Sequence, residues 1–522
     1  MSGVDDHNFG RWRSLFWPIH SFELRKILPM LLMMFCILFI YTLLRDTKDA
    51  LVVVSAKEGA AVIAFVKVWG VVPSAILFML CFSKLSNIMS KPVLFHSVVS
   101  FFLVFFTVFA LVIYPNHDMV HPHRFSDWLQ SMLPSGASGL VTMFRNWTFT
   151  LFYIFAELWG SVVLSLLYWG FANDVTSVKE AKRYYPLLGI GANLALIFSG
   201  GFIQFITNLN SHLPAAKRWQ ITLNYEVITI LFLGAILMLA YQWMQVNVLT
   251  DARLYNPEER SSLKKSKPKL SLTESLNMIL HSRYLFLVAM LVVGYGMSIN
   301  LVEILWKQSV KQLYHSEVAY LNFMGKFSQA TGVTAIFVML FLGSNIIRTF
   351  GWRVAALTTP IVLGTTATLF FIFILGQNYL SGILFVGSPM LFAVILGAAQ
   401  NVLSKCSKYA LFDPTKEMAY IPLDQESKVK GKAAVDVVGA RLGKSGGSVA
   451  QQLLQLLLGP GVFIAAPYLA VLVLFVIGAW IYSVIGLHKE FEALERKNEE
   501  EDEESSHRGE EASEEVGATA SS

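Results

Sequence analysis

Apolar runs of about 20 residues recur along the whole chain, and each is long enough to cross a lipid bilayer as one helix. Only 15% of the 522 residues are charged, against about 25% in a typical soluble protein, which disfavours a large soluble protein with buried helices. The sequence therefore predicts an all-α integral membrane protein in the lipid bilayer. We predict twelve transmembrane helices, at residues 27–44, 60–82, 93–114, 148–170, 186–207, 225–245, 284–304, 318–343, 353–375, 384–404, 433–458 and 462–486.

The distribution of basic residues predicts how these helices are oriented. If the N-terminus is inside, the inner loops hold most of the lysines and arginines, and the opposite loops around Gln377 and Pro460 hold none. The positive-inside rule then places both termini in the cytoplasm, and we expect a bacterial inner (cytoplasmic) membrane. Basic loops in a membrane protein do not imply nucleic acid, so no nucleic-acid partner is expected, and we expect a monomer. The basic inner loops are those at 84–91, 179–183, 264–269, 348–353 and 416–432.

Neither the N-terminal segment nor the cysteines carry a processing or metal signal. Residues 1–26 are charged and lack a short apolar core, so we expect a cytoplasmic N-terminus and no cleavable signal peptide. Cys36, Cys81 and Cys406 have no motif spacing, which argues against a disulfide framework or a zinc site. The loop at 115–147 contains His117, His121 and His123, and we read it as a solvated loop rather than a metal site. We therefore expect no metal and no cofactor.

The chain divides into two halves that resemble each other. A basic linker, 250–283, separates an N-terminal six-helix half (27–249) from a C-terminal six-helix half (284–488). A capping-box pattern predicts a short surface helix at 272–281 within the linker, and the acidic tail at 489–522 is expected to be disordered. In both halves an Asp, a basic loop and a Pro- or Gly-rich entry lead to a helix containing Ser-Gly-Gly. Two matching halves predict the major-facilitator architecture, with substrate between them near mid-membrane.

The segment 431–455 is charged and glycine-rich within an otherwise apolar chain. On a helix its glycines form a stripe suited to close packing, and its polar side chains form a separate face that we expect to line an aqueous cavity. Its Gly-Ala-Arg-Leu-Gly-Lys-Ser sequence lacks the spacing and the preceding strand of a phosphate-binding P-loop, so ATPase activity is not expected. The polar face holds Arg441, Lys444, Ser448, Gln451 and Gln455, and the stripe holds Gly439, Gly443 and Gly447.

Charged side chains at membrane depth are candidates for function because burying them in lipid is costly. At this depth we count one central acid, Glu157, and four cations, Lys67, Lys326, Arg441 and Lys444. This excess of positive charge predicts an anionic ligand with several charges. The alternative is internal ion pairing, in which Glu157, Glu303 or Asp436 neutralises a lysine.

Other side chains near these charges have two readings. A charged cluster near the outer end of the first helix, Arg45, Asp46, Lys48 and Asp49, is either an exposed helix end or part of a gate or substrate contact. The same two readings apply to Glu303, Trp306 and Lys307 near the outer end of the seventh helix, and Gln451 is a further candidate for gating or binding. Trp69, Tyr153 and Trp159 either stack on a base or simply pack.

Several segments resemble the nucleotide transporter family, the ADP/ATP translocases of obligate intracellular bacteria and plastids, and the chlamydial exchange-type members most. The resemblance implies exchange of external ATP for internal ADP, and it implies that Lys67, Glu157, Glu303 and Lys444 are needed for transport. The matching segments are FIYTLLRDTKDALVV (39–53), FAELWGSVVLS (155–165), the stretch from WGFAND to EAKRYYPLLGIGAN (169–193), INLVEILWK (299–307) and residues 407–448.

From these observations we expect an antiporter that works by alternating access of the two halves, and no enzyme, since no nucleophile–base pair is apparent. The alternative within the same family is a proton-coupled nucleoside triphosphate importer that uses Glu157 or Glu303 as its proton site. A membrane-embedded enzyme acting on a phosphorylated lipid is a third, more distant reading.

Overall fold

The computed structural model describes residues 19–519 except 252, 256–271, 382–387, 424–430, 433, 436–438 and 460. The described residues form helices and no strands, as expected for the all-α class. Eleven of these helices are long and apolar enough to cross a membrane. The predicted span 433–458 is represented by a 19-residue helix, α22 (Ala440–Leu458), and its beginning lies partly outside the described residues.

In the first half, π-helical turns interrupt several membrane helices. The helix α2 (Leu24–Asp49) is extended by residues 50–54, and the second span consists of α3 (Ala61–Phe65), a π-helical stretch 66–71 and α4 (Val72–Ile88). The fourth span is α9 (Trp147–Trp159), a π-helical stretch 160–168 and α10 (Trp169–Val175). The remaining membrane helices of this half are α5 (Lys91–Val108), α11 (Val178–Leu209) and α12 (Ala215–Asn247).

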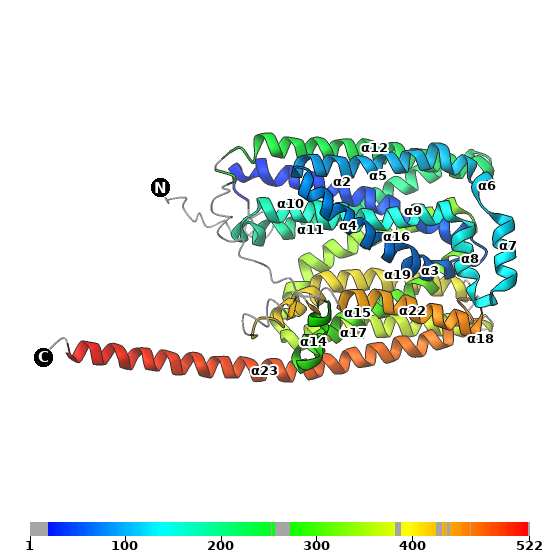
Figure 1. Ribbon diagram of the computed structural model, residues 1–522. Helices are drawn as coiled ribbons and strands as arrows, with labels where there is room; N and C mark the ends of the chain where they lie inside the picture. Colours follow the sequence, from blue (N-terminus) through cyan, green and yellow to red (C-terminus); the bar gives the residue numbers. More distant parts are fainter. Residues whose placement is uncertain are drawn as a thin grey trace.

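The second half begins after the predicted surface helix, which is confirmed as α14 (Leu272–His281). Its membrane helices, besides α22, are α15 (Arg283–Leu313), α16 (Glu317–Val338), α17 (Ser344–Leu375), α19 (Pro389–Ser407) and α23 (Ala466–Thr519). The short helices α18 (Gln377–Leu380) and α20 (Asp413–Met418) complete it. Figure 1 shows α2, α5, α11 and α12 gathered on one side, and α15, α17, α22 and α23 on the other.

We name the two ends of this bundle by what they carry. The tail end is where α2 begins and where α23 projects beyond the other helices (Figure 1). The acidic segment after Lys489, for which we expected disorder, continues α23 as helix to Thr519, because glutamate and alanine are good helix formers. The cap end carries α6 (His117–Val120), α7 (His123–Met132) and α8 (Ser138–Arg145).

The segment at the cap end differs from the solvated loop that we expected. It is folded into short helices, and His121 is buried, with Nε2 2.6 Å from the hydroxyl of Thr148 at the start of α9. The ring of His121 also packs edge-on against Phe149. Apolar packing and one satisfied hydrogen bond therefore fix this segment to the bundle. No metal-binding group of three ligands occurs among the residues described.

The two sides of the bundle are in contact in two regions. The first contact runs along the length of the helices, and the second lies only near the cap end. The helices α11 and α16 pack closely because glycines remove the side chains between them: a Cβ on Gly332 would lie 2.6 Å from the carbonyl oxygen of Asn193. In the second span all five residues of α3 are buried, whereas no residue of α4 is. The contact between the second span and α22 therefore closes the cap end and leaves α4 uncovered towards the tail end.

Candidate functional site

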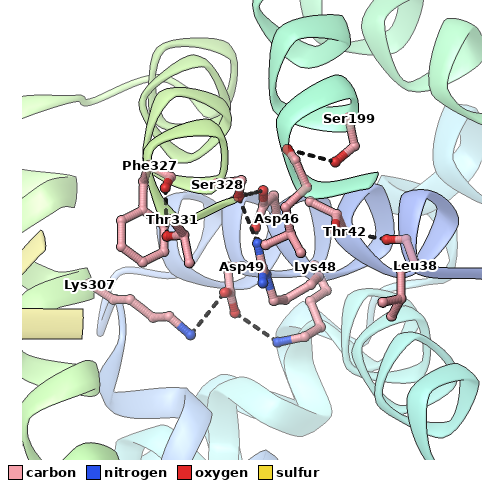
Figure 2. A network of polar contacts seen from close by, with 12 residues as sticks. Leu38, Thr42, Asp46, Lys48, Asp49, Ser199, Lys307, Phe327, Ser328 and Thr331 are labelled. Atoms are coloured by element: carbon pink, nitrogen blue, oxygen red, sulfur yellow. Dashed lines mark hydrogen bonds and ion pairs between the residues drawn. The ribbon is translucent and has the colours of Figure 1, made fainter. Parts of the chain in front are cut away.

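A network of charged side chains joins the two sides of the bundle on the cap-end side of the membrane. Its centre is Asp49, at the end of α2, which accepts an ion pair from Lys48 at 2.9 Å and another from Lys307 of α15 at 2.8 Å. Figure 2 shows both lysines reaching this carboxylate from opposite directions. The three side chains are almost completely buried. Each charge at this depth thus has an opposite charge beside it, as buried charges require.

Two further carboxylates extend the network to the second and fourth spans. Glu157 of α9 lies 3.0 Å from Lys48, and Glu303, one turn before Lys307, lies 2.9 Å from Lys307. Glu303 is also 3.7 Å from Lys67 of the second span. The side chains of Lys67, Glu157 and Glu303 are each about a quarter exposed. A ligand that enters from the tail end can therefore reach this part of the network.

Arg45 and Asp46 bring α16 into the same network. The Nε of Arg45 donates to Asp46 at 2.9 Å, and its Nη2 donates to the hydroxyl of Ser328 on α16 at 2.7 Å. That hydroxyl in turn donates to Asp46 at 2.7 Å, so the three groups form a closed set between the two sides (Figure 2). We call Arg45, Asp46, Lys48, Asp49, Lys67, Glu157, Glu303 and Lys307 the gate network. It contains four cations and four acids.

Hydrogen bonds of amide side chains extend the contacts between the two sides of the bundle as far as α22. Lys67 donates to Asn300 of α15 at 2.7 Å, and Asn300 donates to the hydroxyl of Ser448 on α22 at 2.8 Å. Gln452 of α22 donates to the backbone carbonyl of Ala64 at 2.8 Å and accepts from the indole of Trp69 at 3.1 Å. These bonds tie the second span to α15 and α22.

Three more bonds lie nearer the cap end, and two of them use backbone atoms. The backbone N–H of Ala60 donates to Gln308 at 2.8 Å, and Lys311 donates to the carbonyl of Ala56 at 2.5 Å. The hydroxyl of Ser55 donates to Glu317 at 3.3 Å. The cap end is thus closed by contacts between the connection of the first and second spans and the region where α15 ends and α16 begins.

The expected aqueous face of the segment 431–455 is wrong for the side chains that the structure describes. Ser448, Gln451 and Gln455 are buried, and Gln451 donates to the carbonyl of Leu301 at 3.1 Å. The hydroxyl of Ser448 accepts from Asn300 of α15, whereas Oε1 of Gln451 is buried without a hydrogen-bond partner among the described residues. Burial against α15, rather than water, therefore surrounds this part of the face. The close packing of the glycine stripe is confirmed: a Cβ on Gly443 would lie 3.2 Å from the Cα of Gly296 on α15.

The structure brings together some of the predicted site residues and not others. Lys67, Glu157, Glu303, Arg45 and Lys48 meet in the gate network, and the internal ion pairing that we considered as an alternative is what these residues do. Lys326 is exposed on α16, in a stripe with Val333 and Phe337, and is separated by about 200° on the helix from Ser328. Asp436 lies outside the described residues, as do the side chains of Arg441 and Lys444.

The three aromatic residues considered for base stacking have different surroundings. Tyr153 is fully buried beneath Lys48, whose ammonium lies 3.8 Å from the ring centre. Trp159 is also fully buried, and its indole donates to the carbonyl of Ile37 at 3.1 Å. Trp69 is 60% exposed and presents a face that a ligand can reach.

Some residues of the site were predicted with two readings, and others were not predicted. Lys307, Asp49 and Asp46 carried the same signal as the others, a charge inside an apolar run, but their position near a predicted helix end left an exposed helix-end cluster as the alternative. Ser328 and Asn300 are small uncharged residues that give no such signal. Glu226 of α12 is buried with its Oε2 accepting from the hydroxyl of Thr47 at 2.6 Å, and its position inside an apolar helix was the available clue.

Comparisons with known proteins point to one family. The family model described as "TLC ATP/ADP transporter" matches residues 3–491. The chain is 50% identical over 505 residues to ADP,ATP carrier protein 1 of Chlamydia pneumoniae, covering 96% of this chain and 98% of that protein. It is 44% identical over 506 residues to ADP,ATP carrier protein 1 of Rickettsia prowazekii, covering 96% and 100%. It is 45% identical over 479 residues to the chloroplastic ADP,ATP carrier protein 1 of Arabidopsis thaliana, covering 91% and 75%.

Among solved structures, the fold is similar to that of a bacterial homologue of the iron transporter ferroportin in an inward-facing state. The TM-score is 0.57 at 12% sequence identity, and the alignment covers 88% of this chain and 99% of that one. This similarity confirms the predicted major-facilitator-like architecture.

Proposed function

This chain belongs to the TLC ATP/ADP transporter family, and we propose that it is a membrane antiporter that exchanges external ATP for internal ADP by alternating access. The observation that carries the proposal is the gate network, in which Lys67 and Lys307 join the two sides of the bundle through carboxylates and Arg45 joins them through the hydroxyl of Ser328. A polyphosphate chain offers these same cations a competing set of anionic oxygens. Binding of the substrate and opening of the gate are then one event.

The proposal assigns each part of the network a role. Phosphates that bind Lys67 and Lys48 compete with Glu303 and Glu157, which are the partly exposed members of their ion pairs. We place Lys444 of α22 in the same phosphate site, as the resemblance implies, and Arg441 with it because the two are three residues apart on the predicted polar face. In this way α22 contributes cations from the second half. With those pairs broken, the pair between Asp49 and Lys307 is the remaining ion pair of the network across the interface, and opening of the gate breaks it. The two halves, 27–249 and 284–488, then rock about the substrate.

The same arrangement explains why exchange is favoured over one-way transport. An empty carrier that opens at the cap end separates Asp49 from Lys307 and Asp46 from Ser328 without replacing either contact. Breaking a buried ion pair leaves uncompensated charges, which costs about 3–5 kcal/mol for each pair. A bound nucleotide replaces the lost anionic partners and lowers that cost. Return of the carrier therefore requires a nucleotide on the other side.

We further propose that the tail end faces the bacterial cytoplasm, with both termini there, and that the cap end faces outwards. The basic loops support this orientation because they lie at the same ends of the spans as the N-terminal segment. In this orientation the described conformation has α4 uncovered towards the cytoplasm, where ADP is collected or ATP is released. An exchange of ATP for ADP moves one net charge, so we expect it to respond to membrane potential.

The test is uptake of labelled ATP by proteoliposomes that contain the purified full chain. Uptake should require ADP or ATP inside the vesicles and should be unaffected by a pH gradient across the membrane. Vesicles without internal nucleotide control for one-way transport, and vesicles without protein control for leakage. Uptake that ignores internal ADP and follows the pH gradient would instead support a proton-coupled importer and overturn the exchange mechanism.

A further inference from the structure

Lys405 of α19 is a cation that the gate network does not use. It lies near the end of α19 that leads into the tail-end π-helical turn 408–412, and its side chain is half-buried. Its ammonium is 4.9 Å from the ring centre of Phe327, the residue next to Ser328. No hydrogen bond or ion pair joins its Nζ to any residue within the described part of the chain.

The acids nearest to Lys405 already have other partners. The charged groups that act on it are Arg45, Glu303, Asp46 and Lys307. Asp46 is bonded to Arg45 at 2.9 Å, and Glu303 is bonded to Lys307 at 2.9 Å. Four cations and four acids balance within the gate network, so Lys405 is a surplus positive charge beside it. A half-buried cation without a counter-ion is unfavourable unless a ligand supplies one.

The position of Lys405 fits a ligand that enters from the tail end. Arg45 comes from α2 in the first half and Lys405 from α19 in the second, and Phe327 and Ser328 of α16 lie between them. The two cations therefore flank the same turn of α16, one from each half, and lie close enough to repel each other. Repulsion between them disfavours the empty site, and a shared anion removes that repulsion.

We propose that Lys405 binds the phosphate chain of the transported nucleotide, opposite Arg45. This inference rests on the proposed function and adds a second-half residue that the resemblance did not identify. The ammonium supplies a point charge, while the guanidinium of Arg45 can exchange its bonds to Asp46 and Ser328 for two parallel bonds to a phosphate. Loss of the Asp46–Arg45–Ser328 contact then follows from ligand binding.

The experiment measures binding of ATP, ADP and inorganic tripolyphosphate to the purified full chain in detergent, together with its thermal unfolding midpoint. Lys405→Gln should weaken ATP binding roughly 10- to 100-fold, the effect of one charge-assisted hydrogen bond. Lys405→Arg should retain most of the affinity. Without ligand, the unfolding midpoint of Lys405→Gln should equal or exceed that of the wild type, because an unpaired buried charge has been removed. Lys489→Gln, the same charge change at an exposed position of α23, is the matched control.

The outcomes separate this inference from the proposed function. Wild-type affinity of Lys405→Gln for both ATP and tripolyphosphate would overturn the inference even if the wild-type chain exchanges nucleotides. A ligand-free midpoint below that of the wild type would also overturn it, because Lys405 would then have a structural partner. If the wild-type chain binds tripolyphosphate through Lys405 but exchanges no nucleotide in proteoliposomes, the inference stands for a polyphosphate anion and the proposed function fails.

Discussion

At the scale of single residues, the site depends on charges that neutralise one another inside the membrane. Asp49 is the clearest case, since it is buried between Lys48 and Lys307 and belongs to α2 while Lys307 belongs to α15. Removing one partner of a buried ion pair is more damaging than removing both, because the remaining charge keeps its desolvation cost. The pairs therefore stabilise the described conformation.

We predict that Lys307→Gln lowers the stability of the protein by about 3–5 kcal/mol, because Asp49 and Glu303 lose their shared cation. Thermal unfolding of the purified protein measures this change. The double variant Lys307→Gln with Asp49→Asn should recover part of the loss, since the two changes remove both members of one pair. Lys311→Gln, one turn further along α15, is the control and should have a smaller effect because that lysine is only half-buried. Strictly additive effects of the two changes would contradict the assigned pairing.

The sequence singled out several charged residues that the structure brings together, but it did not predict how they are arranged. Lys67, Glu157 and Glu303 were identified because a charge within an apolar run has few explanations other than function. Their partners were not identified, since a pairing between residues of different helices depends on helix rotation, and sequence spacing does not determine that rotation. The expected aqueous face on α22 failed for a related reason: Ser448 and Gln451 find acceptors and donors on α15, so their polarity does not imply water.

At the scale of the elements, the two halves are joined most extensively by the packing of α11 on α16. The crossing is close because Gly200 and Gly325 meet with their backbones, and Gly332 does the same against Asn193. Small residues at such positions allow helices in a membrane to approach closely. The Ser-Gly-Gly sequence on α11 therefore has a structural role, and the shared pattern in the two halves marks packing surfaces.

Adjacent glycines on α11 allow a matched test of this packing. A Cβ at Gly200 would overlap the backbone carbonyl oxygen of Gly325, whereas a Cβ at Gly201 would lie 3.5 Å from the side-chain amide nitrogen of Gln329. We predict that Gly200→Ala destabilises the protein by about 1–3 kcal/mol, and that Gly201→Ala has little effect. Thermal unfolding of the two variants measures the difference. Equal midpoints would show that α16 can shift to accommodate the methyl group.

The cap-end helices should be sensitive to acid through His121. Burial, followed by the neighbouring His117 and His123, lowers the pKa of His121 to about 4. An unfolded histidine titrates near pH 6.5, so between about pH 6.5 and 4 the unfolded segment binds more protons than the folded one. The stability of this segment should therefore fall through that range, by at most about 3 kcal/mol, and be constant above it. Hydrogen exchange of residues 117–145 measures this loss, and His121→Asn should abolish its pH dependence.

At the scale of the whole molecule, the structure is one conformation of a two-sided carrier. Apart from the packing of α11 on α16, contacts between the halves gather on the cap-end side, where α3, the gate network and α22 meet, and α4 has no buried residue. The all-helical class, eleven of the twelve predicted membrane helices and the family follow from sequence patterns. The closed side does not, because in the proposed cycle the same sequence forms both conformations by rotation of whole halves.

A cross-link at the closed end tests this view of the transport cycle. The hydroxyl of Ser55 lies 3.3 Å from the carboxylate of Glu317, on the first and second halves respectively. Because the glutamate side chain spans part of this gap, a short cross-linker suits the pair better than a direct disulfide. In a background where the exposed Cys81 is replaced by serine, a short bis-methanethiosulfonate reagent should link Ser55→Cys to Glu317→Cys. We predict that cross-linking stops exchange and that reduction restores it, because the cap end must open once in every cycle. Each single cysteine variant controls for reaction elsewhere, and undiminished exchange in the cross-linked protein would contradict alternating access.

The closure also has a consequence for how this family drifts in sequence. Three of the contacts at the closed end are hydrogen bonds between a side chain and a backbone atom: Gln308 with Ala60, Lys311 with Ala56, and Gln452 with Ala64. Only one residue of each pair therefore contributes through its side chain. Every amino acid except proline supplies the same backbone groups. Substitutions at positions 56, 60 and 64 should therefore be limited only by the size of the new side chain, so that glycine or serine is accepted in place of alanine. Positions 308 and 452 should be intolerant, and a library that scores growth on imported nucleotide should separate the two groups.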